Sequence, residues 1–286
     1  MNSLKKNLQW YFLGLLFVAT FFVWREVFAL NGGTLKFYLL DVGQGDAIFI
    51  ETPSGNQILI DGGPDKSVLR ELGEVMPFYD RTIDLVILTH PHLDHVGGLV
   101  EVLKNYEVEK FMDSGNTHTI AEFGELESML EVKNVEQVEA RRGTEVVLGE
   151  GTRLSILAPA ELKSGSNLHN NMVISRLSFG EVDFLLMGDA ERPLEFFLLE
   201  RGDDIASEVL KAGHHGSKTS SSQLFLGEVQ PQLALISVGR KNKYGHPNQE
   251  VLDNLAATSA KILRTDLDGR IEIVSDGRSL SVHTLR

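Results

Sequence analysis

The sequence predicts an α/β protein built as a four-layer αββα sandwich, in which helices cover the outer faces of two packed sheets, preceded by one apolar N-terminal segment. Two observations support this prediction. Strand-like and helix-like runs alternate in both halves of the chain, and residues 83–89 (IDLVILT) form a continuous apolar run typical of a strand buried on both faces. With 286 residues, 42% of them hydrophobic and 23% charged, the chain is long enough to bury such a core.

The first element is the apolar segment. Lys5 and Lys6 precede a nearly uninterrupted apolar run from Leu8 to Trp24. This run of about seventeen residues is longer than most secretory signal cores and short for a spanning helix, and we expect an uncleaved membrane anchor over residues 1–31. Two alternatives stay open: a signal peptide cut after Ala29, or a buried core helix. In both membrane interpretations the lysines stay inside and residues 32–286 lie on the extracytoplasmic side.

The next part of the chain opens the first sheet and reaches a group of histidines. Residues 53–56 (PSGN) supply a turn between two strands. Strands are expected at Leu35–Leu40, Ala47–Glu51, Gln57–Ile60 and Ile83–Thr89, and helices at Ser67–Val75, Gly97–Asn105 and Ile120–Glu131. The strand at 83–89 leads directly into the histidines.

The second half repeats this alternation without a linker after residue 33, so residues 32–286 are expected to form one domain. Residues 145–157 should give two strands around a turn at Gly149–Gly151. Further elements are a hairpin of Met172–Phe179 and Val182–Met187 around Gly180, a helix at Pro193–Glu200, and strands at Val209–Ala212 and Leu233–Val238.

Composition limits the chemistry. The chain has no cysteine, which excludes disulfides, thiolate metal sites and a cysteine nucleophile, so any metal must be held by histidine and carboxylate. The formal net charge of −13 disfavours a protein that grips nucleic acid over a broad basic face. A local cationic site is compatible with this net charge.

The strongest signal is the run His90-Pro91-His92-Leu93-Asp94-His95, directly after the buried strand. A tight loop at the end of a strand can direct His90 and His92 at one metal, and Asp94 and His95 at a second. Imidazole and carboxylate donors suit Zn²⁺ or Mn²⁺. We therefore expect the motif to bind two divalent metal ions, Zn²⁺ or Mn²⁺. The alternative is a solvated histidine-rich loop.

This motif, its strand and the following Gly97-Gly98 resemble the metallo-β-lactamase fold superfamily. From about Thr34 to the end, the chain more closely resembles the C-terminal domain of ComEC, the DNA-uptake channel of bacterial competence. Five motifs in family order carry that similarity: residues 41–46 (DVGQGD), 59–63 (LIDGG), 186–190 (LMGDA), 210–217 (LKAGHHGS), and 237–239 (SVG) with 244–247 (YGHP).

The resemblance implies roles for individual residues. Asp189 matches the carboxylate that bridges the two metals. His214 matches the last ligand, on the second metal, with His215 as the fallback and otherwise an outer-shell or substrate contact. Asp61 is expected in the outer shell, where it would hold the ligand loop by hydrogen bonds, and we place Asp46 there as well.

The position of the third ligand departs from the superfamily pattern. The superfamily commonly has a histidine before the strand that leads to the bridging aspartate, whereas the ComEC-like group has an asparagine-rich stretch, here residues 167–171 (NLHNN). His169 could restore the ligand, or Asn170 could stand there and leave that metal weakly held. The number of bound metals depends on whether His169 or Asn170 occupies this position.

A polar loop supplies the expected anion site. His246 lies between Lys243 and Pro247, and with Ser217 and Lys218 it could contact phosphate oxygens without reading sequence. An ordinary polar turn is the alternative. Substrate contacts are thus expected from Ser217, Lys218, Lys243 and Asn170, and direct participation in catalysis from Asp94, His215 and His246.

A metal pair that activates water makes this a hydrolase site that needs no protein nucleophile. The resemblance to ComEC implies a phosphodiesterase or nuclease acting on DNA, and contact with competence machinery, although one apolar segment stands where ComEC has a polytopic channel, so we do not expect a DNA pore. Two alternatives remain: a hydrolase of another extracellular ester, such as a wall-polymer phosphoester, and a metal-poor accessory binding module. No obligate protein partner is evident.

Overall fold

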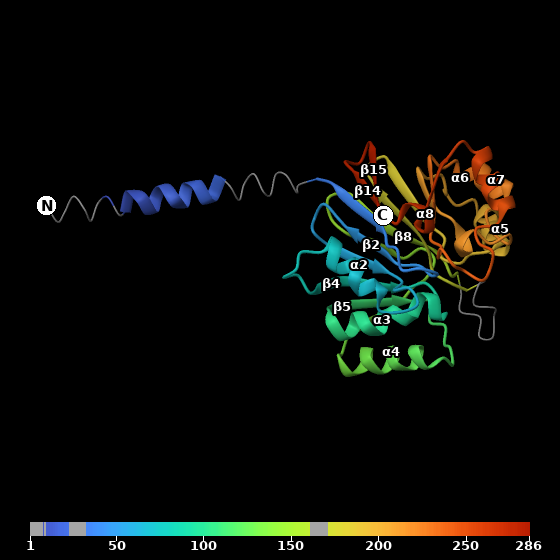
Figure 1. The fold of residues 1–286 in the computed structure, drawn as a ribbon, viewed down its shortest axis with the longest axis horizontal. Coiled ribbons are helices and arrows are strands. Elements are labelled where there is room, and N and C mark those ends of the chain that lie inside the picture. Colours follow the sequence, from blue (N-terminus) through green and yellow to red (C-terminus); the bar gives the residue numbers. More distant parts are fainter. Residues whose placement is uncertain (1–7, 9, 23–32, 161–170) are drawn as a thin grey trace.

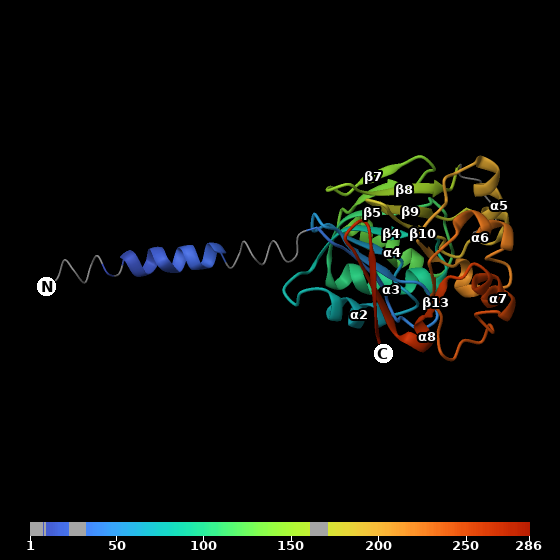
Figure 2. The same cartoon turned by 90° about the horizontal axis from the view of Figure 1, so that it is seen from above.

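Two sheets packed face to face form the centre of the protein, and helices cover their outer faces (Figure 1). The computed structural model describes residues 8, 10–22, 33–160 and 171–286. Figure 2 shows the same ribbon turned by 90°, with the gold to red helices of the second half of the chain at the end away from the N-terminal helix. This arrangement confirms the predicted α/β architecture of two sheets flanked by helices.

The first sheet has eight strands in the order β15-β14-β1-β2-β3-β4-β5-β6. Pairing is antiparallel from β15 to β3 and parallel from β3 to β6. The strands are β1 (Leu35–Leu39), β2 (Ile48–Glu51), β3 (Gln57–Ile60), β4 (Thr82–Leu88), β5 (Glu107–Asp113), β6 (Glu136–Glu139), β14 (Arg270–Ser275) and β15 (Leu280–Leu285). Because β1, β3 and β4 run in the same direction, the residues that follow each of them emerge at one end of the sheet.

The second sheet has seven strands in the order β13-β12-β11-β10-β9-β8-β7. Pairing is antiparallel from β7 to β10 and parallel from β10 to β13. The strands are β7 (Glu145–Val147), β8 (Thr152–Ala158), β9 (Ile174–Phe179), β10 (Val182–Leu186), β11 (Val209–Lys211), β12 (Leu233–Ile236) and β13 (Lys261–Arg264).

The helices divide between the two outer faces. One buried cluster joins the first sheet to α2 (Ser67–Val75), α3 (Leu93–Asn105) and α4 (Ala121–Val132). Another joins the second sheet to α5 (Arg192–Arg201), α6 (Gln223–Val229) and α7 (Gln249–Ala257). Two short helices, η2 (Gly213–Gly216) and α8 (Thr265–Asp268), lie in the connections.

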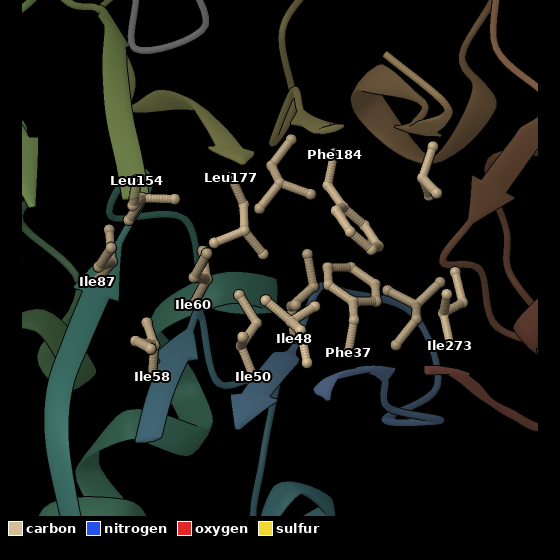
Figure 3. Packing of buried hydrophobic residues seen from close by; sticks show 14 of the residues in the cluster. Phe37, Ile48, Ile50, Ile58, Ile60, Ile87, Leu154, Leu177, Phe184 and Ile273 are labelled. Carbon is tan, nitrogen blue, oxygen red and sulfur yellow. The ribbon is translucent and has the colours of Figure 1, made fainter. Parts of the chain in front are cut away.

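The space between the sheets is filled by aliphatic and aromatic side chains from both of them (Figure 3). Phe37 on β1 stacks on Phe184 of β10, with ring centroids 4.9 Å apart and planes inclined by 23°. Alternate residues of β2 and β3, such as Ile48, Ile50 and Ile58, point into the same layer. This dry layer holds the ends of the two sheets in a constant relation to each other.

Several elements differ from the expected ones. Helix α3 begins at Leu93, inside the histidine motif, and not at Gly97. The strands β14 and β15 were not expected, and they extend the first sheet beyond β1. Residues 10–22 are helical, and in the described part of the chain no helix is long and apolar enough to cross a membrane. The anchor or signal over residues 1–31 stays a prediction.

Candidate metal centre

The candidate site lies at the end of the sandwich where the parallel strands finish. Strand β4 leads through Thr89 into the histidine motif, and β3 leads into Asp61. On the second sheet, β10 is followed by Asp189, and β11 by His214 and His215. The end of an α/β sheet at the carboxyl termini of its strands is where such folds usually bind ligands.

Four donors form the first group: Asp94, His95, Asp189 and His215. Their ligand atoms all lie within 4.8 Å of one another. His215 Nε2 is 3.3 Å from Asp94 Oδ2 and 3.4 Å from Asp189 Oδ1, and His95 Nε2 is 3.3 Å from Asp189 Oδ2. Two imidazoles and two carboxylates at this spacing suit one divalent cation.

A second group contains His90, His92 and Asp189. His90 Nε2 lies 2.9 Å from His92 Nδ1 and 3.9 Å from Asp189 Oδ2. Asp189 is therefore common to both groups, as expected of a carboxylate that two cations share. His169 and Asn170, the alternatives for a third ligand here, lie outside the described residues.

The buried atoms of the first group fit a cation. Among the described residues, His95 Nε2, His215 Nε2 and Asp189 Oδ1 are buried and have no hydrogen-bond partner. Buried polar atoms without a partner are costly, and nitrogen and oxygen atoms that converge in this way are the donors a metal requires. The residues present therefore fit the dinuclear centre that the motif predicts.

The adjacent histidines 214 and 215 point to different partners. His215 is buried, its Nδ1 donates to the carbonyl oxygen of Ser237 over 2.9 Å, and its Nε2 belongs to the first group. His214 Nε2 lies 3.8 Å from Asp189 Oδ2, and its Nδ1 lies 3.1 Å from Glu191 Oε1. The geometry thus places His215, the predicted fallback, in the four-donor group, and His214 beside it.

The backbone explains why these two side chains diverge. His214 and His215 have φ angles of 46° and 52°, so both lie in the left-handed region. The intervening turn is the short helix η2, which starts directly after β11 and ends at Gly216. Two consecutive left-handed residues reverse the chain tightly and direct the two imidazoles to different partners.

Asp61, which was expected in the outer shell, lies behind His95. It is buried, and its Oδ2 accepts a hydrogen bond of 2.8 Å from His95 Nδ1. The backbone N–H of Thr89 donates to Asp61 Oδ1 over 2.8 Å, and the Thr89 hydroxyl donates to Oδ2 over 2.7 Å. These bonds fix the tautomer of His95 so that its Nε2 faces the four-donor group.

Glycines let helix α3 approach this loop closely. The N–H of Gly62 donates to the His95 carbonyl over 2.7 Å, and the N–H of Gly98 donates to the Gly63 carbonyl over 3.0 Å. A Cβ atom on Gly98 would collide with the carbonyl oxygen of Gly62. The Gly97-Gly98 pair of the motif therefore allows Asp94 and His95, on the first turn of α3, to reach the centre.

The site is strongly polarised in the absence of a cation. Burial disfavours the imidazolium of His215, but the carboxylates of Asp189 and Asp46 outweigh that effect and raise its pKa to about 10. Burial likewise opposes the charged carboxylate of Asp94, but the nearby imidazoles of His215 and His95 lower its pKa to about 2. The pKa of His95 is raised and that of Asp189 is lowered by the same attractions, again against burial.

The predicted substrate contacts lie around the rim. The His246 ring centroid is 5.7 Å from that of His214, and the His246 ring stacks on Tyr244. Burial, followed by the charges of His214 and His215, lowers the pKa of His246. Ser217 is buried, and its hydroxyl shares a 2.9 Å hydrogen bond with Thr219. Lys218 and Lys243 are exposed.

A family model of the metallo-beta-lactamase superfamily matches residues 40–240. The chain belongs to this superfamily. The matched range contains every residue of the two donor groups, from His90 to His215. The resemblance inferred from the motifs is therefore confirmed.

Two curated proteins are similar along most of this chain. ComE operon protein 3 of Bacillus subtilis is 31% identical over 251 residues, which cover 82% of this chain and 32% of that protein. Recombination protein 2 of Haemophilus influenzae is 30% identical over 254 residues, 85% of this chain and 29% of that protein. The chain thus spans about a third of the length of these relatives.

A solved structure shows the same superfamily fold at low identity. The metallo-beta-lactamase fold protein YhfI from Bacillus subtilis has a TM-score of 0.51 and 12% sequence identity, with 81% of this chain and 96% of that chain covered. At this identity the likeness extends to the fold alone.

Sequence reasoning missed two residues near the centre. Lys211 is fully buried beside Asp46, although a lysine on a strand is usually placed at the surface. His118, which lies outside the sequence motifs, has its ring centroid 6.0 Å from that of His92. Its place in the loop after β5 is the available signal, because β5 is parallel to β4 and the two strands end side by side.

Proposed function

We propose that this chain is a metal-dependent phosphodiesterase that acts on DNA, with two divalent cations, Zn²⁺ or Mn²⁺, held by the two donor groups. The observation that carries the proposal is the position of Asp189, buried between the groups and common to both. A bound pair of this kind lowers the pKa of water towards neutrality and polarises the scissile phosphate.

The side chains of this protein then have separate tasks. His95 and His215, held by Asp61 and Ser237, direct their Nε2 atoms inward. Asp94 completes that group, and it is the donor most exposed to an incoming substrate, with 32% of its side chain accessible. We expect His246, at the rim, to contact the leaving group.

The preference for a phosphodiester rests on charge and on the relatives. The exposed lysines 218 and 243 suit a phosphate chain better than a neutral ester. One relative is named for recombination, and another, from Neisseria gonorrhoeae, is competence protein ComA. Both names point to DNA, so we also propose competence machinery as the setting.

We further propose that the domain acts outside the cytoplasm, held at the membrane by its N-terminal segment or released by a cut after Ala29. The lysines before the apolar run support this orientation. Fractionation of cells that express a C-terminally tagged chain, combined with protease protection, tests it. Protection of the tag in intact spheroplasts would contradict it.

The activity is tested with purified protein loaded with Mn²⁺ or Zn²⁺. Linear single-stranded and double-stranded DNA are compared with a chromogenic phosphodiester and with choline phosphate esters. We expect DNA cleavage that chelator abolishes. Asp94→Ala should lose at least about a hundredfold in kcat, since it removes a donor.

Glu101→Ala is the matched control, because Glu101 lies on the same helix and its side chain forms a surface ion pair with Lys104. It should keep full activity. Hydrolysis of the small esters without cleavage of DNA would rule out the nuclease and favour another phosphoester. Less than one equivalent of bound metal would favour an accessory binding module.

A further inference from the structure

Lys211 is a fully buried lysine at the end of β11, between the two sheets. Its exposed fraction is 0%, and that of its partner Asp46 is 1%. The Lys211 ammonium contacts Asp46 Oδ2 and donates to the carbonyl oxygen of Gly188 over 2.8 Å. Gly188 directly precedes Asp189, the carboxylate common to both donor groups. One ammonium thus binds two segments that carry parts of the site.

Asp46 in turn holds His215. The second carboxylate oxygen of Asp46, Oδ1, lies 3.3 Å from His215 Nδ1, on the side of the ring opposite the metal-facing Nε2. The backbone N–H of Asp46 also donates to the carbonyl oxygen of Asp94 over 3.1 Å. Asp46 therefore touches two of the four residues in the first donor group.

The loop that carries Asp46 belongs to the first sheet, and Lys211 belongs to the second. Gly45, next to Asp46, approaches the Asp94 carbonyl so closely that a Cβ atom would collide with it. The Ser237 hydroxyl on the other sheet donates to the Gly45 carbonyl over 2.6 Å. Lys211 thus forms a buried ionic connection across the sheets at the place where the donors meet.

A pure stability role explains this arrangement poorly. A buried ion pair costs desolvation on both partners, and replacement by apolar residues of similar size is often neutral or stabilising. The cost is understandable where the charges orient another group. The contacts of Lys211 end on the neighbours of Asp189 and His215, which are donors of the same proposed cation.

We propose that Lys211 is a positioning residue of the metal centre, which holds Asp46 against His215 and Gly188 next to Asp189. This inference rests on the proposed metal centre but not on the identity of the substrate. It assigns Lys211 to the cation bound by Asp94, His95, Asp189 and His215.

The test is a titration of purified apoprotein with Mn²⁺ alone, in which free Mn²⁺ is followed by electron paramagnetic resonance. The variants are Lys211→Met, Asp46→Asn and the double variant. Outer-shell partners typically contribute about 10- to 100-fold to metal affinity, so each variant should weaken at least one of the two sites by that factor.

Lys36→Met is the matched control, because Lys36 pairs with Glu51 over 3.2 Å across β1 and β2, with 29% of each side chain exposed. It should bind both cations as the wild type does. Lys211→Met leaves the buried Asp46 carboxylate without its partner, which is strongly destabilising. If that variant does not fold, the double variant provides the test, because it removes both buried charges together.

A folded Lys211→Met or double variant that binds both cations with affinities within about twofold of the wild type would overturn the inference, whatever the protein hydrolyses. Wild-type protein that binds two cations but cleaves no DNA would overturn the proposed substrate and leave Lys211 in its role. Wild-type protein that binds no cation would overturn both.

Discussion

The distinct partners of the two adjacent histidines lead to a prediction at the scale of single residues. His215 Nε2 lies within 3.4 Å of both carboxylates of the first donor group, whereas His214 Nδ1 faces Glu191. We expect His215→Ala to retain about one equivalent fewer of bound metal than the wild type. His214→Ala should retain the wild-type amount.

Metal analysis after loading and desalting checks this prediction, and each variant is the control for the other. The reverse result, with loss only in His214→Ala, would restore His214 as the ligand that the family pattern suggested. The sequence could not decide between them, because the left-handed backbone at both positions sets the direction of each ring.

The pKa values of the site predict how cation binding depends on pH. In the apoprotein, His215 is protonated up to about pH 10, and a cation must displace that proton. Affinity for Mn²⁺ should therefore rise from pH 6.5 to pH 8.5, with protons released on binding. Calorimetric titrations in two buffers of different ionisation enthalpy measure this release. Binding that releases no protons would contradict it.

The same shift predicts the stability of the apoprotein. Because the pKa of His215 is raised from 6.5 to about 10 in the folded state, its contribution is fully present below pH 6.5 and is lost as pH rises towards 10. Asp94 acts in the opposite direction, since its lowered pKa contributes stability that is lost as pH falls from 3.8 towards 2. Urea unfolding in chelator at several pH values follows both effects.

At the scale of the elements, the stacked rings of Phe37 and Phe184 join β1 to β10. Both side chains are fully buried. Phe184→Ala should lower the free energy of unfolding by about 3–5 kcal/mol, because it removes apolar contacts and leaves a cavity between the sheets. The double variant with Phe37→Ala should cost less than the sum of the two single variants, since the rings contact each other.

Denaturant unfolding in chelator measures these changes without a contribution from bound cations. Phe78→Ala is the control, because that ring is 86% exposed, and its loss should change stability by less than about 0.5 kcal/mol. Equal losses in Phe78→Ala and Phe184→Ala would contradict the inter-sheet layer as the main source of stability.

Local signals were sufficient for some elements and not for others. The apolar run 83–89 and the turn at 53–56 identify β4 and the β2–β3 hairpin, because the hydrophobic pattern and the turn residues lie within these elements themselves. The hairpin of β14 and β15 depends instead on pairing with β1, more than 200 residues earlier in the chain. The site shows the same division: spacing revealed His90 to His95, but the burial of Lys211 depends on Asp46 from the other sheet.

At the scale of the whole molecule, the proposed cations bind across the sandwich. His90, His92, Asp94 and His95 follow the first sheet, and Asp189 and His215 follow the second. Saturation with Mn²⁺ should therefore stabilise the complete fold, by about 2.7 kcal/mol for each bound cation at a hundred times its dissociation constant. Differential scanning calorimetry with and without Mn²⁺ measures the shift.

Asp189→Asn should abolish most of this stabilisation. Asp183→Asn is the control, because Asp183 lies on β10, the strand that precedes Asp189, and pairs with Arg176. It should respond to Mn²⁺ like the wild type. A stabilisation that survives in Asp189→Asn would mean that the cation binds elsewhere.

The direction of β1 has a practical consequence for handling the protein. The strand enters the sandwich at Leu35 and runs towards the loop of Asp46, so its first residue lies at the end of the sheet remote from the donors. Five extended residues span about 15 Å. A bead, resin or surface attached ahead of Leu35 therefore leaves the end of the sheet with the donors open. Immobilised protein should then cleave long DNA, the proposed substrate, as readily as free protein does.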